Sequence, residues 1–206
     1  MENIYQNADL IVQTTKGCTM DCKGCYLAKP GKSTELDTET YRAEIAKLQK
    51  GNVVALRGGE ITKINNWFAK FVAPAIKMGL MVVIESNGHF IEANNYNEVL
   101  EGMKNPAIDV NISCDKIHLG NKNPAQKEEE FAKMARFASD ATERGINFGF
   151  YALMSTEEIP DFVEGTALAE YLGKFHALPF YADISQVSLH GKYLNCEGRI
   201  SDKIPR

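Results

Sequence analysis

Three cysteines lie close together near the start of the chain, with the spacing C-x3-C-x2-C. They are Cys18, Cys22 and Cys25, in the stretch Gly-Cys-Thr-Met-Asp-Cys-Lys-Gly-Cys-Tyr-Leu. Thiolates are soft ligands, and three of them on one loop can bind an iron–sulfur cluster or zinc. A cubane cluster has four irons, so three cysteines leave one iron open. An open coordination position is typical of a metal centre that takes part in chemistry.

A second motif with chemical potential is Gly58-Gly59-Glu60. Glycines allow the backbone to approach a ligand closely, because a side chain there would collide with it. The carboxylate of Glu60 is suited to an ammonium group. Two glycines followed by an acid are also common in ordinary turns, so the placement of this motif decides its meaning.

The elements that must position these motifs alternate between strand and helix. Helical segments are expected from Asp37 to about residue 50 and over 66–78, 94–103, 126–144 and 160–173, with Pro74 kinking the second of them. Strands are expected over residues 9–15, 52–56, 80–85, 107–113, 146–154 and 183–190.

This alternation predicts an α/β fold with parallel strands and right-handed crossovers. Six units are fewer than the eight of a closed barrel, so we expect an open, partial (β/α)6 barrel. Residues 1–206 are expected to form a single domain, with a core over about 9–190 and a short C-terminal tail at 191–206.

Polar residues follow several of the predicted strands at their C-terminal ends, where ligands bind in such folds. Strand 107–113 also has a polar face, formed by Asp109, Asn111 and Ser113. A parallel strand that is buried on both sides is usually apolar throughout. The interior of the barrel is therefore expected to hold something polar.

Taken together, the cysteine motif after the first strand, the Gly-Gly-Glu motif after the second and the six-unit pattern resemble the radical S-adenosylmethionine (SAM) superfamily. The resemblance covers about residues 9 to 190. It implies that Cys18, Cys22 and Cys25 hold a 4Fe–4S cluster whose open iron binds SAM. One electron, from a flavodoxin- or ferredoxin-like donor, would then cleave SAM to a 5′-deoxyadenosyl radical that abstracts a substrate hydrogen.

The same resemblance implies roles for other strand-end residues. Glu60 would bind the methionine ammonium, beside Gly58 and Gly59. The carboxylate or the ribose hydroxyls of SAM would be bound by Ser86, Asn87 and Ser113, for which a simple strand-end cap is the competing interpretation.

The cysteine loop departs from the common family pattern at one position. Family members commonly have an aromatic residue before the third cysteine, whereas this chain has Gly24, and Tyr26 follows Cys25. This version is similar to the activating enzymes of anaerobic ribonucleotide reductase and related glycyl-radical activases. It implies a peptide or partner protein as substrate. The alternative is the same chemistry on a small metabolite or nucleoside.

A rival of another class is a non-enzymatic zinc-binding domain. Zinc would need a fourth ligand, such as His89 or His118, and would leave the Gly-Gly-Glu motif without a role. His190 is the weak candidate for proton transfer. Cys114 is interpreted as a buried structural thiol and Cys196 as an incidental one.

Composition excludes several further classes. The 206 residues carry a net charge of −4 without a basic run, which disfavours general nucleic-acid binding. No apolar stretch approaches the ~18 residues that a membrane helix needs. The N-terminus does not resemble an export signal, and the five cysteines are an odd number. We therefore expect a cytoplasmic protein whose thiols stay reduced.

Overall fold

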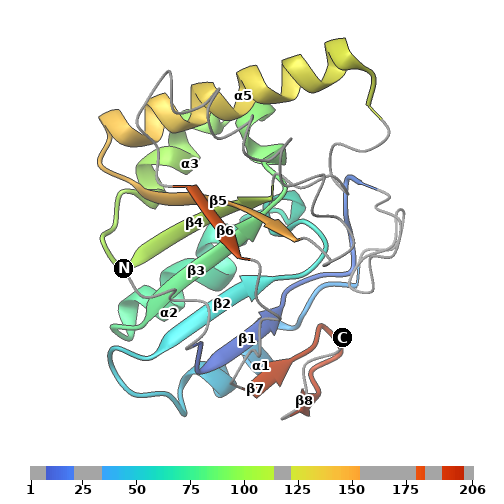
Figure 1. Ribbon diagram of the computed structural model, residues 1–206. Helices are drawn as coiled ribbons and strands as arrows, with labels where there is room; N and C mark the ends of the chain where they lie inside the picture. The colour runs from blue at the N-terminus through green and yellow to red at the C-terminus, as the bar shows by residue number, and fades with distance from the viewer. Residues whose placement is uncertain (1–7, 21–33, 114–121, 154–179, 184–191, 202–206) are drawn as a thin grey trace.

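The computed structural model describes residues 8–20, 34–113, 122–153, 180–183 and 192–201. These residues form a twisted sheet with helices packed against it (Figure 1). The strands in chain order are β1 (Leu10–Gln13), β2 (Val53–Arg57), β3 (Met81–Ser86), β4 (Ile108–Ser113), β5 (Asn147–Leu153), β6 (Phe180–Asp183), β7 (Lys192–Leu194) and β8 (Ile200–Ser201).

The strands lie in the order β6-β5-β4-β3-β2-β1-β7-β8. All neighbouring pairs are parallel except β7 and β8, which are antiparallel. Within the described part of the chain, β6 and β8 form the two edges and do not pair with each other. The sheet is thus open, and the predicted partial barrel of parallel strands is confirmed.

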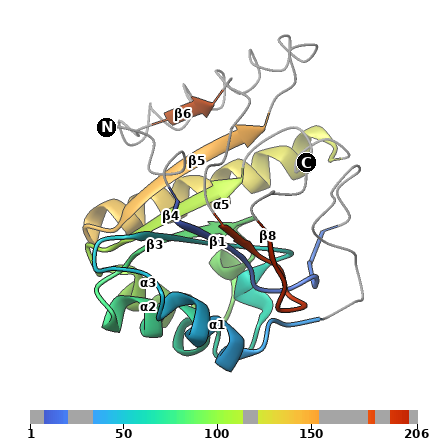
Figure 2. The same cartoon turned by 90° about the horizontal axis from the view of Figure 1, so that it is seen from below.

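Helices cover the outer side of this sheet. Figure 2 shows α1, α2 and α3 beneath the strands. Asp37 caps the first helix as expected, since its carboxylate accepts a hydrogen bond from the backbone N–H of Thr40. The helical segments are α1 (Thr38–Ile45), η2 (Ile61–Lys63), η3 (Phe68–Val72), α2 (Ala73–Lys77), η4 (His89–Glu92), α3 (Tyr96–Met103) and α5 (Pro124–Glu143).

The main hydrophobic core lies between the helices and the outward face of the strands. Alternate strand residues such as Val54 and Leu56 belong to it, together with Phe137 of α5. A smaller cluster on the inward face contains Ile11, Ala55, Val83 and Tyr193. The strands β1, β2 and β3 therefore bury apolar residues on both faces, which anchors the C-terminal ends that carry the site.

The segment predicted as one helix with a kink at Pro74 changes helix type instead. A π-helical turn over Phe68–Val72 runs directly into α2, in which Pro74 lies in the first turn. Proline lacks an N–H, and in an α-helix its ring would collide with the carbonyl four residues earlier. The wider π turn places the break in hydrogen bonding just ahead of the proline.

The expected tail at 191–206 contains two short strands that the sequence did not predict. Lys192–Leu194 is β7 and Ile200–Ser201 is β8, and β7 pairs in parallel with β1, with Ile11 opposite Tyr193. The Tyr193 hydroxyl donates to Gln13 Oε1 at 2.8 Å, and Lys16 forms an ion pair with Glu197. Three residues, Lys192–Leu194, are too short a run for an alternating pattern to be recognised.

Other expectations fall wholly or partly outside the described residues. The sixth strand was expected at 183–190, whereas β6 covers Phe180–Asp183 and residues 184–191 are not described. The expected helix at 160–173 is also not described. None of the described helices combines the length and apolar character that crossing a bilayer requires.

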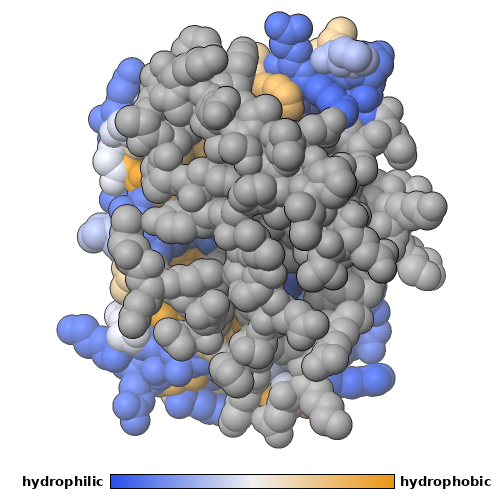
Figure 3. Space-filling view, in the orientation of Figure 1, coloured by the Kyte–Doolittle hydropathy of each residue, from blue (hydrophilic) through white to orange (hydrophobic). Residues whose placement is uncertain are grey.

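The described surface is largely polar. In Figure 3, the described atoms at the upper and lower margins of this view are mostly hydrophilic. Met78 and Ile200 are the large hydrophobic residues among the described ones that are exposed. Single exposed hydrophobic residues of this kind are normal on a folded domain.

Candidate active site

Because β1, β2, β3 and β4 run parallel, their C-terminal ends all lie along one side of the sheet. This C-terminal edge, at which the strands end, is distinct from the edge strands β6 and β8. The predicted site residues follow these ends: Cys18 comes after β1, Glu60 after β2 and Asn87 after β3. Ser113 is the last residue of β4, one position beyond Ile112, which pairs with Ser86. The structure therefore gathers residues from the ends of four successive strands of the chain.

The cysteine loop leaves and rejoins the sheet at adjacent points. The N–H of Leu36 donates to the carbonyl of Thr14 at 2.8 Å, and the N–H of Lys16 donates to the carbonyl of Thr34 at 3.0 Å. These two hydrogen bonds form the stem of the loop. They fix the backbone just before Cys18, the first cysteine of the motif.

Gly58 and Gly59 pack directly against this loop. Gly59 N–H donates to Thr15 O, and Glu60 N–H donates to Gly17 O, both at 2.7 Å. A Cβ on Gly59 would lie 1.8 Å from Gly17 O, and one on Gly58 would lie 2.6 Å from Thr15 O. Both glycines are thus required by the close contact of two backbones, a reason that sequence reasoning missed.

The carboxylate of Glu60 is completely buried and forms the centre of a hydrogen-bond network. Its Oε1 accepts from Thr62 N at 3.1 Å, from Thr62 Oγ1 at 2.6 Å and from Ser86 Oγ at 2.9 Å. Its Oε2 accepts from Asn87 N at 2.8 Å. A carboxylate oxygen can accept roughly two hydrogen bonds, and among the described residues Oε2 accepts one, from Asn87 N.

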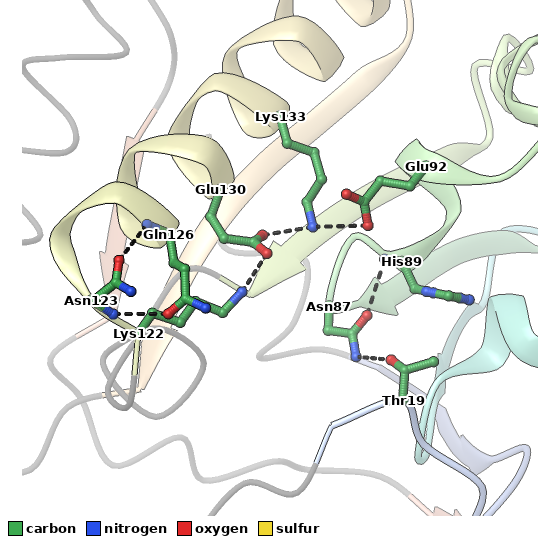
Figure 4. Close-up of polar contacts among 9 residues, drawn as sticks. All are labelled: Thr19, Asn87, His89, Glu92, Lys122, Asn123, Gln126, Glu130 and Lys133. Atoms are coloured by element: carbon green, nitrogen blue, oxygen red, sulfur yellow. Dashed lines mark hydrogen bonds and ion pairs between the residues drawn. The ribbon is translucent and has the colours of Figure 1, made fainter.

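Ser86 and Asn87 use their side-chain hydrogens within the protein. Ser86 donates its hydroxyl hydrogen to Glu60 and accepts from Gly88 N at 3.0 Å. The amide nitrogen of Asn87 lies 3.1 Å from Thr19 Oγ1 and 3.7 Å from Cys18 Sγ. Figure 4 shows Asn87 between the cysteine loop and the turn that starts η4.

Figure 4 also shows the polar contacts that tie α5 to this edge of the sheet. Lys133 of α5 pairs with Glu92 of η4 at 3.6 Å and with Glu130 of its own helix at 2.6 Å. Lys122 pairs with Glu130 as well. The start of α5 is fixed by a capping box between Asn123 and Gln126. The turn that carries Asn87 is thus supported from the helix side.

The sulfur of Cys18 accepts hydrogen bonds from described neighbours. It accepts from the Asn87 amide and from Met20 N, the latter at 3.4 Å, while Lys63 Nζ lies 3.3 Å from Cys18 O. N–H groups directed at sulfur suit a metal-bound thiolate, which is a stronger acceptor than a thiol. The described part of the motif therefore fits a cluster ligand.

The inward face of the sheet below this edge is polar, as predicted. In the strand register, Gln13 of β1 lies opposite Arg57 of β2, and Glu85 of β3 lies opposite Asn111 of β4. Arg57 Nε lies 3.2 Å from Glu85 Oε2, so the structural ion pair is one role of Arg57. Asp109 is half-buried on the same face, and this burial raises the pKa of its carboxyl.

Several predicted residues lie outside the described part of the chain. They are Cys22, Cys25, Cys114, His118 and His190. Their roles stay predictions. Among the described residues, no three His, Cys, Asp or Glu side chains are grouped so as to hold a metal ion. Because two of the three motif cysteines lie outside that set, this finding bears on neither the cluster nor zinc.

Cys196, interpreted as an incidental thiol in a tail, is instead part of the main core, with 3% of its surface exposed. Burial raises the pKa of its thiol above the ordinary value. It is thus a packed core residue, and its buried neutral thiol is poorly suited to exchange reactions.

Comparison of the sequence with family models gives a match to the radical SAM superfamily over residues 12–166. The chain belongs to this superfamily. Radical SAM proteins are enzymes that use a 4Fe–4S cluster and SAM, so the predicted cofactors and the general chemistry are confirmed at the level of the family. No curated protein matches the chain significantly.

Solved structures of similar fold carry SAM. Native anSMEcpe with bound AdoMet has a TM-score of 0.60 and 17% identity, covering 85% of this chain and 52% of that one. For native anSMEcpe with bound AdoMet and Kp18Cys peptide the values are 0.61, 17%, 85% and 51%. Streptococcus suis SuiB bound to S-adenosylmethionine gives 0.58, 12%, 96% and 60%. At these identities the likeness shows the fold, and this chain spans little more than half of those proteins.

Proposed function

We propose that this radical SAM enzyme abstracts hydrogen from a peptide or a partner protein. Cleavage of SAM, the chemistry that the bound cofactors supply, consumes one electron and yields methionine and a 5′-deoxyadenosyl radical. That radical takes a hydrogen atom from the substrate to give 5′-deoxyadenosine and a substrate radical. The electron comes from a flavodoxin- or ferredoxin-like donor.

The observation that carries the proposal is the contact between the cysteine loop and the ends of β2 and β3. Cys18, Cys22 and Cys25 are assigned to the cluster. The N–H donors around the Cys18 sulfur and the stem of the loop support this assignment for the first cysteine. Zinc at the same cysteines would leave the buried network around Glu60 without a ligand to serve.

The methionine part of SAM is assigned to the edge that carries this network. Glu60 Oε2 accepts from Asn87 N and keeps capacity for an ammonium group. Gly58 and Gly59 keep Glu60 beside the cysteine loop through their backbone contacts. The carboxylate or ribose is assigned to the end of β4, where Ser113 is buried, and the main chain at Ser86 and Asn87 contributes the remaining polar groups.

Two observations favour a peptide over a small metabolite or nucleoside. The sheet is open between β6 and β8 within the described part of the chain, and an open barrel suits a large substrate. A peptide is bound in one of the structures of similar fold. The Gly24-Cys25-Tyr26 version of the loop further supports an activase, which would act on a glycine loop of a partner protein.

The organisation of the chain follows from the same proposal. Residues 1–206 are assigned to a single radical SAM domain, because β7 lies beside β1 and joins the last described strands to the first. A cytoplasmic location is proposed as well, since a thiolate-bound cluster needs a reducing compartment.

The test starts with anaerobic reconstitution with iron and sulfide, followed by dithionite and SAM. We expect about four irons per chain, the number in a cubane cluster, and slow formation of 5′-deoxyadenosine measured by chromatography. Cys22→Ala should lose both. Cys196→Ala is the matched control, because it removes a cysteine that is buried in the core and is not part of the C-x3-C-x2-C motif. Uptake of zinc without a cluster would contradict the function.

The substrate class is tested with deuterium. Peptides that carry α-deuterated glycine, or a glycyl-radical partner protein labelled in the same way, are incubated with the reconstituted enzyme. Transfer of deuterium into 5′-deoxyadenosine is expected if the labelled carbon is the site of abstraction. Deuterium transfer from small metabolites or nucleosides, with none from peptides, would contradict the peptide assignment while leaving the radical chemistry intact.

A further inference from the structure

Asn87 forms the described side-chain link between the end of β3 and the first cysteine. Its Nδ2 carries two hydrogens and has two acceptors, Cys18 Sγ at 3.7 Å and Thr19 Oγ1 at 3.1 Å. Its Oδ1 accepts from His89 N at 3.0 Å (Figure 4). This last bond determines which end of the amide faces the cysteine loop, because a flipped amide would bring two donors together.

The backbone of Asn87 is fixed as firmly as its side chain. Its N–H donates to Glu60 Oε2, and the next N–H, that of Gly88, donates to Ser86 Oγ. Gly88 has a φ of +81°, a conformation that glycine adopts without strain. Glu60 is itself held by Thr62 and Ser86. The amide that faces the sulfur therefore has little freedom to move away.

Hydrogen bonds to cysteine sulfur change the reduction potential of an iron–sulfur cluster. Reduction adds negative charge that is shared with the sulfur ligands, so an N–H donor stabilises the reduced state more than the oxidised one. Within the described part of the chain, the main-chain N–H of Met20 and the side chain of Asn87 both donate to the Cys18 sulfur. Of these two, the donor that a substitution can remove is the side chain.

We propose that Asn87 is a positioning residue for the cluster, and that its amide raises the reduction potential through the Cys18 sulfur. Glu60 acts through Asn87 in the same way, by holding its backbone. The inference rests on the proposed function, because it requires the cluster. It assigns the side chain of Asn87 to the iron–sulfur side of the site rather than to the methionine or ribose of SAM.

The test is a potentiometric titration of the reconstituted protein, followed by electron paramagnetic resonance without SAM. Asn87→Leu has a similar shape and no N–H donor. Its midpoint potential should move to more negative values, so that the ratio of reduced to oxidised cluster at a fixed solution potential falls by at least about threefold, or about 28 mV for one electron. Thr19→Val is the matched control, since it removes the other acceptor and leaves the sulfur contact; its potential should stay unchanged.

A second measurement covers the case in which Asn87→Leu does not assemble a cluster. Resonance Raman bands of the iron–cysteine bonds in the unsubstituted protein should shift on exchange into D2O, and Asn87→Ala should reduce that shift. A cluster with the same potential in Asn87→Leu as in the unsubstituted protein would overturn the inference and leave the proposed function standing. Failure of the unsubstituted protein to bind any cluster would overturn both.

Discussion

Replacement of Gly59 by alanine distinguishes two reasons for having glycine at this position. One is the close contact with the backbone of the cysteine loop, and the other is the close approach of the cofactor. The new Cβ would lie 1.8 Å from Gly17 O, far inside an ordinary contact of 3.4 Å or more. Moving the two backbones apart by the missing ~1.5 Å breaks the hydrogen bonds Gly59 N to Thr15 O and Glu60 N to Gly17 O. At about 1 kcal/mol for each bond, with about 1–3 kcal/mol for overpacking, we expect a loss of about 3–5 kcal/mol in the free energy of unfolding.

The assay is urea unfolding of the metal-free protein, followed by circular dichroism. Gly145→Ala is the control: Gly145 has a φ of +67° and open space around its Cβ position, so its substitution costs about 1–2 kcal/mol of backbone strain alone. Iron content after reconstitution should also fall in Gly59→Ala, because Gly17 precedes Cys18. If Gly59→Ala destabilises the metal-free protein no more than Gly145→Ala and binds full iron, the packing argument is refuted and close approach of the cofactor is the remaining reason.

Three further predictions concern the sheet and its core. Phe137 is fully buried against Phe90, Phe148 and Phe150, so Phe137→Ala should cost about 3–5 kcal/mol by thermal unfolding; a loss below 1 kcal/mol would contradict this packing. Arg57→Met should cost about 3–5 kcal/mol because it leaves Glu85 buried without this partner, and adding Glu85→Leu should recover most of the loss. Asp109→Asn should raise the urea midpoint at pH 7, because burial raises the pKa of the Asp109 carboxyl above its ordinary value of 3.8, so that the charged form destabilises the folded protein. Below pH 3.8 the carboxyl is protonated in both the folded and the unfolded protein, and the gain should vanish. A gain that is equal at pH 3 and pH 7 would exclude this cause.

The strands that could be predicted from the sequence are those with a long apolar or alternating pattern. β2, β3, β4 and β5 begin and end within one residue of the expected bounds, because runs such as Val-Val-Ala-Leu and Met-Val-Val-Ile have no competing helical interpretation. β7 was missed because its three residues carry no period. Its position is determined by pairing with β1, a contact that local patterns do not report.

The sequence predicted that the site residues lie close together, and the roles assigned to them stay predictions. Placement at the C-terminal ends of parallel strands brought Cys18, Glu60 and Asn87 together, as the structure has them. The hydrogen-bond partners depend on side-chain directions and distances between strands, which no spacing encodes. The one usable signal was the adjacency of the ends of β1 and β2, from which the close contact at Gly58 and Gly59 could have been inferred.

The pairing of β7 with β1 has a consequence for how the protein matures. Tyr193 and Gln13 are 180 positions apart in the chain, and Lys16 and Glu197 are 181 apart. At about 5–20 residues per second, a ribosome needs about 10–40 s to make the intervening chain. The three motif cysteines are therefore synthesised well before β1, the strand that precedes them, can pair with both β2 and β7. If Cys18, Cys22 and Cys25 bind the cluster as proposed, we expect iron and sulfide to be loaded after β7 has paired with β1, and the thiols to need a reducing environment until then.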